Sequence, residues 1–194
     1  MNFLAHLYLS ERTDGSFLGA LYGDFLKGYR VSDFPLEIQR GIRLHQYIDT
    51  FTDDHPAFRR SKRRIDPSRR RYAGVIIDIF YDHFLAKYWS DYSEQSLEMF
   101  TQKVYQLLEK NMETLPGRLQ GLTPHMIRED WLMAYGTDQG IDRTFRRLSR
   151  RIRRENQVDE SLLDLQLHRP MLYQDFTEFF PALQAQVEGF AVDL

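Results

Sequence analysis

RYAGVIIDIFYDHFLAKYW, from Arg71 to Trp89, is the stretch that decides the fold. It has helical length, no Pro and a single Gly. Its apolar side chains cover almost every direction around a helix, and a helix that is apolar all round belongs in a core. Asp78 and Asp82 nevertheless lie one turn apart on one face, with His83 beside the second. Because buried carboxylates are costly unless they are paired, protonated or bound to a cation, this helix predicts a positive partner inside the fold.

The remaining sequence predicts further helices packed around this one. No segment alternates between apolar and polar residues as a strand would, and the chain shows no internal repeat. Its 194 residues are 42% apolar, which is enough for one sizeable core. We therefore predict an all-α fold, a single-domain helical bundle spanning residues 1–194.

Composition excludes several classes of protein. The chain has no cysteine, so we expect neither a disulfide framework nor a thiolate metal site. No apolar run reaches the length of a membrane span, and the first residues lack the basic region of a signal peptide. We expect a cytoplasmic protein with no membrane partner.

Proline and small polar residues predict several helix ends. Pro35 is expected to start a helix that runs through residues 36–53 and ends at His55-Pro56, and Ser93 is expected to cap the helix that follows the central one. Thr123 and Pro124 are expected to start a helix, and the last helix is expected to begin at Met171.

Three glycines, Gly15, Gly19 and Gly23, recur every four residues in the apolar segment SFLGALYGDF and its flank. This spacing predicts that another helix approaches closely there.

Positive charge is concentrated in two segments. Residues 59–71 contain eight basic residues and one acid, and residues 143–154 contain seven basic residues and no acid. These segments hold 15 of the 26 basic residues, which leaves 11 basic residues against 27 acids elsewhere. Such segregation indicates either an acidic macromolecule or phosphate ligand at a local patch, or two solvated helix faces.

Acids and histidines recur at helical spacing in the most apolar helices. They form three groups: Asp24 with His6, then His45, Asp49 and Asp53, then Asp78, Asp82 and His83. Oxygen and imidazole ligands without sulfur suit Mn²⁺, Mg²⁺, Fe²⁺ or Zn²⁺, and facing helices of a bundle commonly build such sites. Helix caps and surface ion pairs would explain any one of these residues, but the whole set favours a metal site.

Four motifs carry a resemblance to a known family. They are NFLAHL at residues 2–7, GDF at 23–25, RLHQYIDTFTD at 43–53 and DIFYDHFLA at 78–86, and the aromatic tail YQDFTEFFPALQAQ joins them. In this order and spacing the chain resembles the acyl carrier protein phosphodiesterase family over nearly its whole length. That family is regarded as a distant relative of the helical HD phosphohydrolases, so the resemblance implies an HD-domain-like bundle. The chain departs from the HD pattern because it has the reversed pair Asp82-His83 and no His-Asp dipeptide.

The resemblance implies a specific reaction. Members hydrolyse the phosphodiester that links 4′-phosphopantetheine to a serine of holo-acyl carrier protein, a carrier of fatty acid biosynthesis, and they need a divalent metal, typically Mn²⁺. Mg²⁺ or another divalent ion would also suit these ligands. We expect the ion to be held by Asp24, His45, Asp49, Asp78 and Asp82.

Proton transfer and substrate binding complete the expected site. Asp24 would act through the ion, while His83 and His6 are the candidates for protonating the leaving serine oxygen. Acyl carrier proteins are strongly acidic, so the basic segments would steer and dock the substrate. We expect the substrate-binding arginines to be Arg43, Arg59, Arg63, Arg147 and Arg150.

Two other functions fit the same residues. One is a metal-dependent nucleotide or nucleic-acid phosphohydrolase of HD type. Proteins that bind single-stranded nucleic acid stack its bases on aromatic residues set among basic ones, and this chain does not interleave the two. Nucleic acid is therefore not the expected partner. The other is a non-catalytic binding module for an acidic protein, in which the buried acids are structural.

Overall fold

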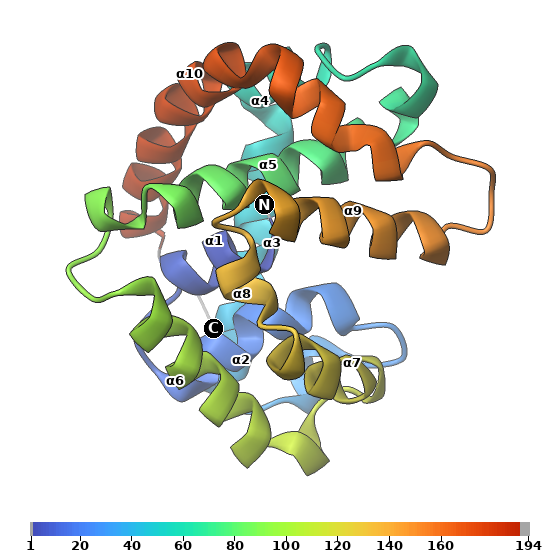
Figure 1. Cartoon of the computed structure of the whole chain (residues 1–194). Helices are drawn as coiled ribbons and strands as arrows, with labels where there is room; N and C mark the ends of the chain where they lie inside the picture. Colours follow the sequence, from blue (N-terminus) through green and yellow to red (C-terminus); the bar gives the residue numbers. More distant parts are fainter. Residues whose placement is uncertain (1, 191–194) are drawn as a thin grey trace.

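The computed structural model describes residues 2–190, which form ten α-helices joined by short turns and 3₁₀ segments (Figure 1). The α-helices are α1 (Phe3–Leu9), α2 (Asp14–Tyr22), α3 (Leu36–Asp54), α4 (Pro56–Lys62), α5 (Ala73–Lys87), α6 (Leu97–Lys110), α7 (Gly117–Arg128), α8 (Trp131–Ala134), α9 (Asp138–Arg151) and α10 (Ser161–Glu188). The 3₁₀ segments are η1 (Gly23–Phe25), η2 (Val31–Asp33), η3 (Pro67–Tyr72), η4 (Trp89–Asp91), η5 (Met112–Thr114) and η6 (Val158–Glu160). Residues 2–190 contain no β-strand, so the predicted all-α class is confirmed, while the HD-like arrangement stays a prediction.

Helix α5 lies at the centre of the fold, as its sequence predicts. It crosses the middle of the molecule and contacts α1, α4, α9 and α10, which surround it (Figure 1). Seven of its hydrophobic side chains are at most 2% exposed: Ile76, Ile77, Ile79, Phe80, Tyr81, Phe84 and Leu85. Each such burial contributes about 1.5–3 kcal/mol, so α5 anchors the hydrophobic core. Within residues 2–190, no helix combines the length and apolarity that a membrane crossing requires.

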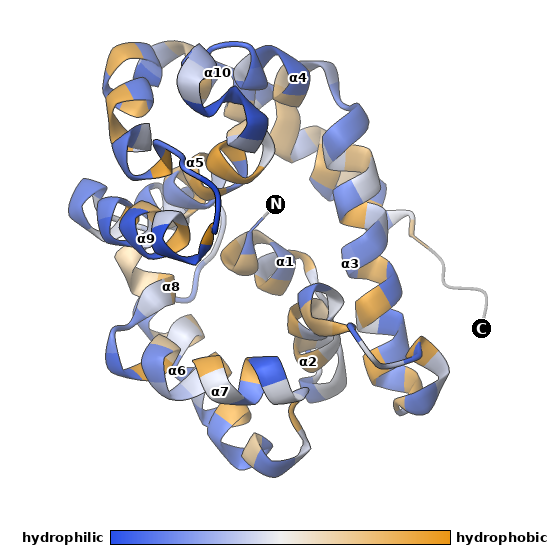
Figure 2. Ribbon diagram, turned by 90° about the vertical axis from the view of Figure 1, so that its right-hand side faces the viewer, coloured by the Kyte–Doolittle hydropathy of each residue, from blue (hydrophilic) through white to orange (hydrophobic). Residues whose placement is uncertain are grey.

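Helix α1 lies in the middle of the molecule and is attached to α5 through Asp82 (Figure 2). The backbone N–H of Leu4 donates to Asp82 Oδ2 at 2.8 Å, and that of Ala5 donates to Oδ1 at 3.2 Å. The first N–H groups of a helix have no partner within the helix, so a carboxylate placed there satisfies them. Asp82 therefore holds the start of the helix that carries His6.

Helices α2 and α3 touch through their backbones. A Cβ added at Gly19 would lie 2.4 Å from Ile38 O and 2.7 Å from the Cα of Gly41, and one added at Gly41 would lie 2.6 Å from Ser16 O. Only glycine leaves room for this approach, so the close packing predicted from the glycine spacing is confirmed. The contact fixes the position of α3 and of the histidine and acids along it.

Several predicted helix ends are wrong, and local hydrogen bonds explain why. Ser96, not Ser93, caps α6, because its hydroxyl accepts from the backbone N–H of Met99. Thr123 and Pro124 lie inside α7, where the Thr123 hydroxyl donates to Leu119 O one turn back. Helix α10 begins at Ser161, ten residues before the expected start, and contains two prolines.

The first basic segment is attached to α10 by buried acids. Arg60 and Arg64 both donate to the carboxylate of Asp175, and Arg69 donates to Asp164 at 2.6 Å. Asp175 and Asp164 are only 2% and 4% exposed. A buried acid with charged donors is strongly held in place, so these three arginines serve the fold. The remaining basic residues of the segment are the ones free of that role.

Candidate functional site

The centre of the candidate site is a cluster of His6, His45 and Asp49, which come from α1 and α3. His6 Nε2 lies 3.1 Å from Asp49 Oδ1, and His45 Nε2 lies 3.2 Å from Asp49 Oδ2. The two imidazole rings stack with centroids 3.8 Å apart, and one ligand atom from each of the three residues lies within 4.8 Å of the others. Asp24 joins the cluster, since its Oδ1 lies 3.7 Å from His45 Nε2.

A hydrogen bond to the backbone of α2 fixes the orientation of the His45 ring. Its Nδ1 lies 2.7 Å from Ala20 O, and because a carbonyl oxygen only accepts, Nδ1 is the nitrogen that donates there. Nε2 is therefore the nitrogen that faces Asp49 and Asp24. Gly23 makes room for the ring, since a Cβ at that position would lie 2.3 Å from two of its carbon atoms. An outer hydrogen bond that sets the tautomer is typical of metal-binding histidines.

The protonation of the two histidines differs although their rings touch. Burial and the charge of His45 lower the pKa of His6 to about 3, so His6 is neutral near pH 7. Burial would also lower the pKa of His45, but the hydrogen bond to Asp49 and the charge of Asp24 outweigh it and raise that pKa. Burial would raise the pKa of Asp49. The hydrogen bonds from both histidines outweigh this effect and hold the pKa of Asp49 well below its usual value.

An acidic pocket of about 180 Å³ opens beside this cluster. Its lining, which we call the acid pocket, consists of Asp24, Asp49, Thr52, Asp53 and Asp78. Desolvation raises the pKa of Asp24 even though 46% of its side chain is accessible, and the charge of His45 opposes that rise. Desolvation likewise raises the pKa of Asp78, and the charges of Asp49 and Asp53 add to it. Four carboxyl groups facing one small pocket repel one another, so the pocket favours a cation.

The donor set fits a divalent metal ion. Two imidazole nitrogens and carboxylate oxygens are ligands that Mn²⁺ accepts, and Mg²⁺ or Zn²⁺ also binds subsets of them. The ligands must give up their protons to bind, and His6 and Asp49 are already in their unprotonated forms near pH 7. Thr52 lines the same pocket but has a structural role, because its hydroxyl donates to Ile48 O at 2.7 Å.

Two residues of the expected site make other contacts. Both oxygens of Asp82 accept from the start of α1, and burial raises the pKa of Asp82 to about 7. His83 is fully buried, with Nδ1 2.7 Å from Tyr135 O and Nε2 3.1 Å from the guanidinium of Arg169. Neither side chain lines the acid pocket. The sequence placed Asp82 with Asp78 on one helical stripe, but it held no sign that α1 would cover one end of that stripe.

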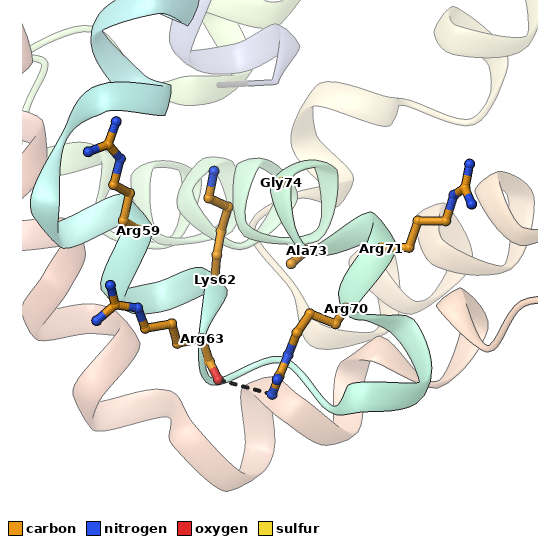
Figure 3. Close-up of a pocket in the computed structure, with 7 residues that line it drawn as sticks. All are labelled: Arg59, Lys62, Arg63, Arg70, Arg71, Ala73 and Gly74. Atoms are coloured by element: carbon orange, nitrogen blue, oxygen red, sulfur yellow. Dashed lines mark hydrogen bonds between the residues drawn. The ribbon is translucent and has the colours of Figure 1, made fainter.

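A second, basic pocket lies beside the first turn of α5 (Figure 3). Its volume is about 480 Å³, and its lining, which we call the basic pocket, consists of Arg59, Lys62, Arg63, Arg70, Arg71, Ala73 and Gly74. Figure 3 shows Arg59 and Lys62 on α4, Arg63 just after it, and Arg70 and Arg71 on η3, with Arg70 donating to the backbone oxygen of Arg63. These are the members of the first basic segment that α10 does not hold.

The two pockets meet at Asp53. Lys62 Nζ lies 3.4 Å from Asp53 Oδ1, and Arg59 Nε donates to the backbone oxygen of Asp53 at 3.1 Å. A phosphate group bound between the pockets would therefore meet the acidic cluster on one side and cations on the other. Sequence reasoning did not single out Lys62, whose position nine residues after Asp53 gives no helical signal across the break at His55.

The other expected substrate-binding arginines lie elsewhere. Arg147 donates to Glu129 and its guanidinium lies 4.3 Å from the centre of the Trp131 ring. Arg150 is exposed on α9 and Arg43 is exposed on α3. None of these three lines the acid pocket or the basic pocket.

Comparison with known proteins tests the resemblance over the whole chain. A profile described as acyl carrier protein phosphodiesterase matches residues 1–183, which include every residue of both pockets. The chain belongs to the acyl carrier protein phosphodiesterase family. The resemblance seen in the four motifs is thereby confirmed.

Relatives of this family match the chain from end to end. The acyl carrier protein phosphodiesterase of Enterobacter sp. (strain 638) is 31% identical over 190 residues, which cover 97% of this chain and 98% of that protein. The protein of the same name from Klebsiella pneumoniae (strain 342) is 32% identical with the same coverage. That of Salmonella agona (strain SL483) is 30% identical over 187 residues, 96% of this chain and 97% of the relative. No solved structure matches the chain at a significant level.

Proposed function

We propose that this protein hydrolyses the phosphodiester between 4′-phosphopantetheine and a serine of holo-acyl carrier protein, giving the apo-carrier and free 4′-phosphopantetheine. The observation that carries the proposal is the convergence of His6, His45 and Asp49 beside the acid pocket, in a chain of this family. The proposal places the protein in the cytoplasm and in fatty acid biosynthesis, the setting of its proposed substrate.

The reaction in this proposal depends on a divalent ion, for which Mn²⁺ is our first choice and Mg²⁺ the alternative. His6, His45, Asp49 and Asp78 would hold it, since their ligand atoms line or border one pocket. When bound, such an ion polarises the phosphoryl oxygen and lowers the pKa of a coordinated water. Asp82 leaves the expected ligand set in this proposal, because both of its oxygens already accept hydrogen bonds from α1.

Asp24 is the residue that we propose as proton acceptor for the attacking water. It lies at the rim of the pocket with its Oδ1 3.7 Å from His45 Nε2, so it borders the ligands while its side chain still reaches solvent. Desolvation raises its pKa, which makes it a stronger proton acceptor than a free carboxylate. A carboxylate in this position takes a proton at Oδ1 and passes it to bulk water.

The two expected proton donors do not fit that role. His6 is buried and neutral, with Nε2 directed at Asp49, which suits a ligand. His83 is enclosed by Tyr135 and Arg169, away from the lining of the acid pocket. Lys62 is the better candidate to stabilise the leaving serine oxygen, because Asp53 holds its ammonium group at the junction of the two pockets.

The basic pocket supports the choice of an acidic carrier protein as substrate. Arg59, Lys62, Arg63, Arg70 and Arg71 present five positive charges around one opening. An acidic protein docked there would be steered by these charges, and its phosphodiester would lie next to the acid pocket. Arg59 and Arg63 stay in the proposal as substrate-binding residues, and Arg43, Arg147 and Arg150 stay predictions that await a direct measurement.

Mass spectrometry of holo-acyl carrier protein after incubation with the protein and Mn²⁺ tests the proposal. We expect the carrier to lose the mass of 4′-phosphopantetheine, and the loss to stop when a chelator is added. Nucleotides and RNA are assayed in parallel, because release of phosphate or nucleotides from them, with the carrier left intact, would support the HD-type alternative instead. Stoichiometric metal analysis addresses the third function: a protein that holds no ion and hydrolyses nothing is a binding module.

A further inference from the structure

A third cavity, about 180 Å³ in volume, is lined by residues of α1, α5, α8 and α9. Its walls are mainly apolar and come from four helices, with Phe3, Val75, Ile79, Trp131 and Leu148 contributing most of the apolar surface. We call this cavity the apolar slot. Neither the sequence motifs nor the reaction proposed above assigns it a role.

Five of the ten residues that line the slot carry polar groups: Asn2, Tyr135, Thr144, Arg147 and Arg151. The Tyr135 hydroxyl accepts from Asn2 Nδ2 at 2.9 Å, and the Arg147 guanidinium is held flat over the Trp131 ring by Glu129. Apolar walls with a small number of fixed polar groups are the usual composition of a small-molecule site. The slot therefore suits a chain that alternates methylene groups with hydrogen-bonding groups.

The slot and the acid pocket share one helix, α5. Val75 and Ile79 lie three residues before and one residue after Asp78 on α5, and residues three apart on a helix are neighbours about 5–6 Å apart. A molecule held at the acid pocket can thus extend into the slot along α5.

We propose that the apolar slot binds the pantetheine arm of the substrate, an uncharged chain of methylene and amide groups. This inference rests on the function proposed above, since it takes the phosphate of the same molecule to lie at the acid pocket. The carrier protein would then lie at the basic pocket, the phosphodiester at the acid pocket and the arm in the slot, and each of the three sites includes residues of α5.

The size of the slot decides between this occupant and larger ones. A cavity of about 180 Å³ accommodates a segment of an extended chain, whereas a protein helix, about 10–12 Å across, exceeds it. The charged groups at its rim are Arg147 and Arg151, both positive. A neutral chain avoids the desolvation cost that a cationic ligand would meet beside them.

The two tryptophans of the chain allow a direct test by NMR. Trp131 lines the slot, whereas Trp89 donates to Gln95 O and lies outside it, so the two indole N–H signals report on separate places. We expect pantetheine, titrated into the protein at millimolar concentration, to shift the Trp131 signal in a saturable way and leave Trp89 unchanged. Inorganic phosphate alone should shift neither. A Trp131 signal that ignores pantetheine overturns the proposal.

A matched pair of variants links binding to turnover. Leu148→Phe narrows the slot from α9, and Leu162→Phe makes the same change at another half-buried position, which is on α10 and outside the slot. We expect Leu148→Phe to weaken pantetheine binding and to lower kcat/KM for holo-acyl carrier protein by about tenfold, with Leu162→Phe close to wild type. Unchanged pantetheine binding in Leu148→Phe would overturn the assignment.

The two proposals fail separately in this design. If holo-acyl carrier protein is hydrolysed normally but pantetheine leaves Trp131 unmoved, the slot assignment is wrong and the proposed function stands. If pantetheine binds at Trp131 but the carrier is not cleaved, the slot exists and the hydrolysis is wrong.

Discussion

Replacing Gly23 with alanine tests the geometry of the acid pocket with a single methyl group. A Cβ at this position would lie 2.3 Å from Cγ and Cδ2 of His45 and 2.7 Å from its Nδ1. The same ring stacks on His6, so it cannot shift far without displacing the second histidine. The backbone of Gly23 is helical, with φ −46° and ψ −39°, which alanine adopts readily. Any effect of Gly23→Ala is therefore steric and acts through the imidazole.

The expected magnitude follows from what the methyl group displaces. Forcing an extra carbon into a packed site costs about 1–3 kcal/mol of folding free energy. Moving the His45 ring also breaks its 2.7 Å hydrogen bond to Ala20 O, the contact that orients Nε2. Loss of such an outer contact typically lowers metal affinity about 10–100-fold. We expect the Kd for Mn²⁺ to rise by that factor, and helix content by circular dichroism to stay near the wild-type value.

Gly74→Ala is the matched control, since no atom lies within 4 Å of a Cβ at that position. Calorimetric titration with Mn²⁺ should give the wild-type Kd for Gly74→Ala and the weakened one for Gly23→Ala. A His45→Ala background completes a double-mutant cycle: the alanine at position 23 should then change the Kd little, because its target ring is gone. Equal Mn²⁺ affinity in the two glycine variants would refute the reasoning.

Four further predictions concern the metal, the buried acids and the basic pocket. Mn²⁺ at 100 times its Kd should raise the free energy of unfolding by about 2.7 kcal/mol, and Asp49→Ala should abolish the thermal shift. Because burial raises the pKa of Asp82 from 3.8 to about 7, the folded state binds the extra proton between these values. The free energy of unfolding should therefore fall as pH rises from 4 to 7, and Asp82 should account for up to about 4 kcal/mol of this fall. Asp82→Asn should remove this pH dependence when unfolding is measured by chemical denaturation at several pH values. Asp175→Ala should cost about 1.5–3 kcal/mol in the same assay, since it removes the charged hydrogen bonds from Arg60 and Arg64, whose side chains are 41% and 19% exposed; a loss below 1 kcal/mol would contradict this role of Asp175. Arg63→Glu should raise KM for the carrier about tenfold with kcat little changed and more so at low salt, whereas an equal effect of Arg150→Glu would place docking on α9.

The sequence predicted the fold where periodicity was strong. Helices α3 and α9 follow apolar stripes with polar opposite faces, and α5 is apolar all round, so their existence followed from spacing alone. Boundaries failed where proline lies inside a helix, as in α7 and α10. Proline disfavours a helix interior locally, but packing of the flanking apolar residues outweighs that preference, and a single sequence does not show the packing.

The site was predictable in part for the same reason. His45 and Asp49 are four residues apart on one helix, and they meet at 3.2 Å as that spacing predicts. Asp78 and Asp82 have the same spacing on α5, yet one lines the acid pocket and the other caps α1. The difference is made by a helix about 75 residues earlier in the chain, which no local pattern encodes.

The division of the arginines shows how the fold connects charge to function. Arg60, Arg64 and Arg69 are neutralised by acids of α10 about 100 residues away, and this fixes α4 and η3 in place. The other basic residues of the same segment, which these acids do not bind, line the basic pocket. The acid pocket, whose charge is opposite, lies beside it. An acid cluster favours a cation and a basic rim favours an anion, and the two are only a side chain apart at Asp53. A phosphodiester bound together with a divalent ion would match both charges, because its anionic oxygens would suit the basic residues and the ion would suit the acids. The opposing charges thus select the same class of substrate that the family relationship indicates.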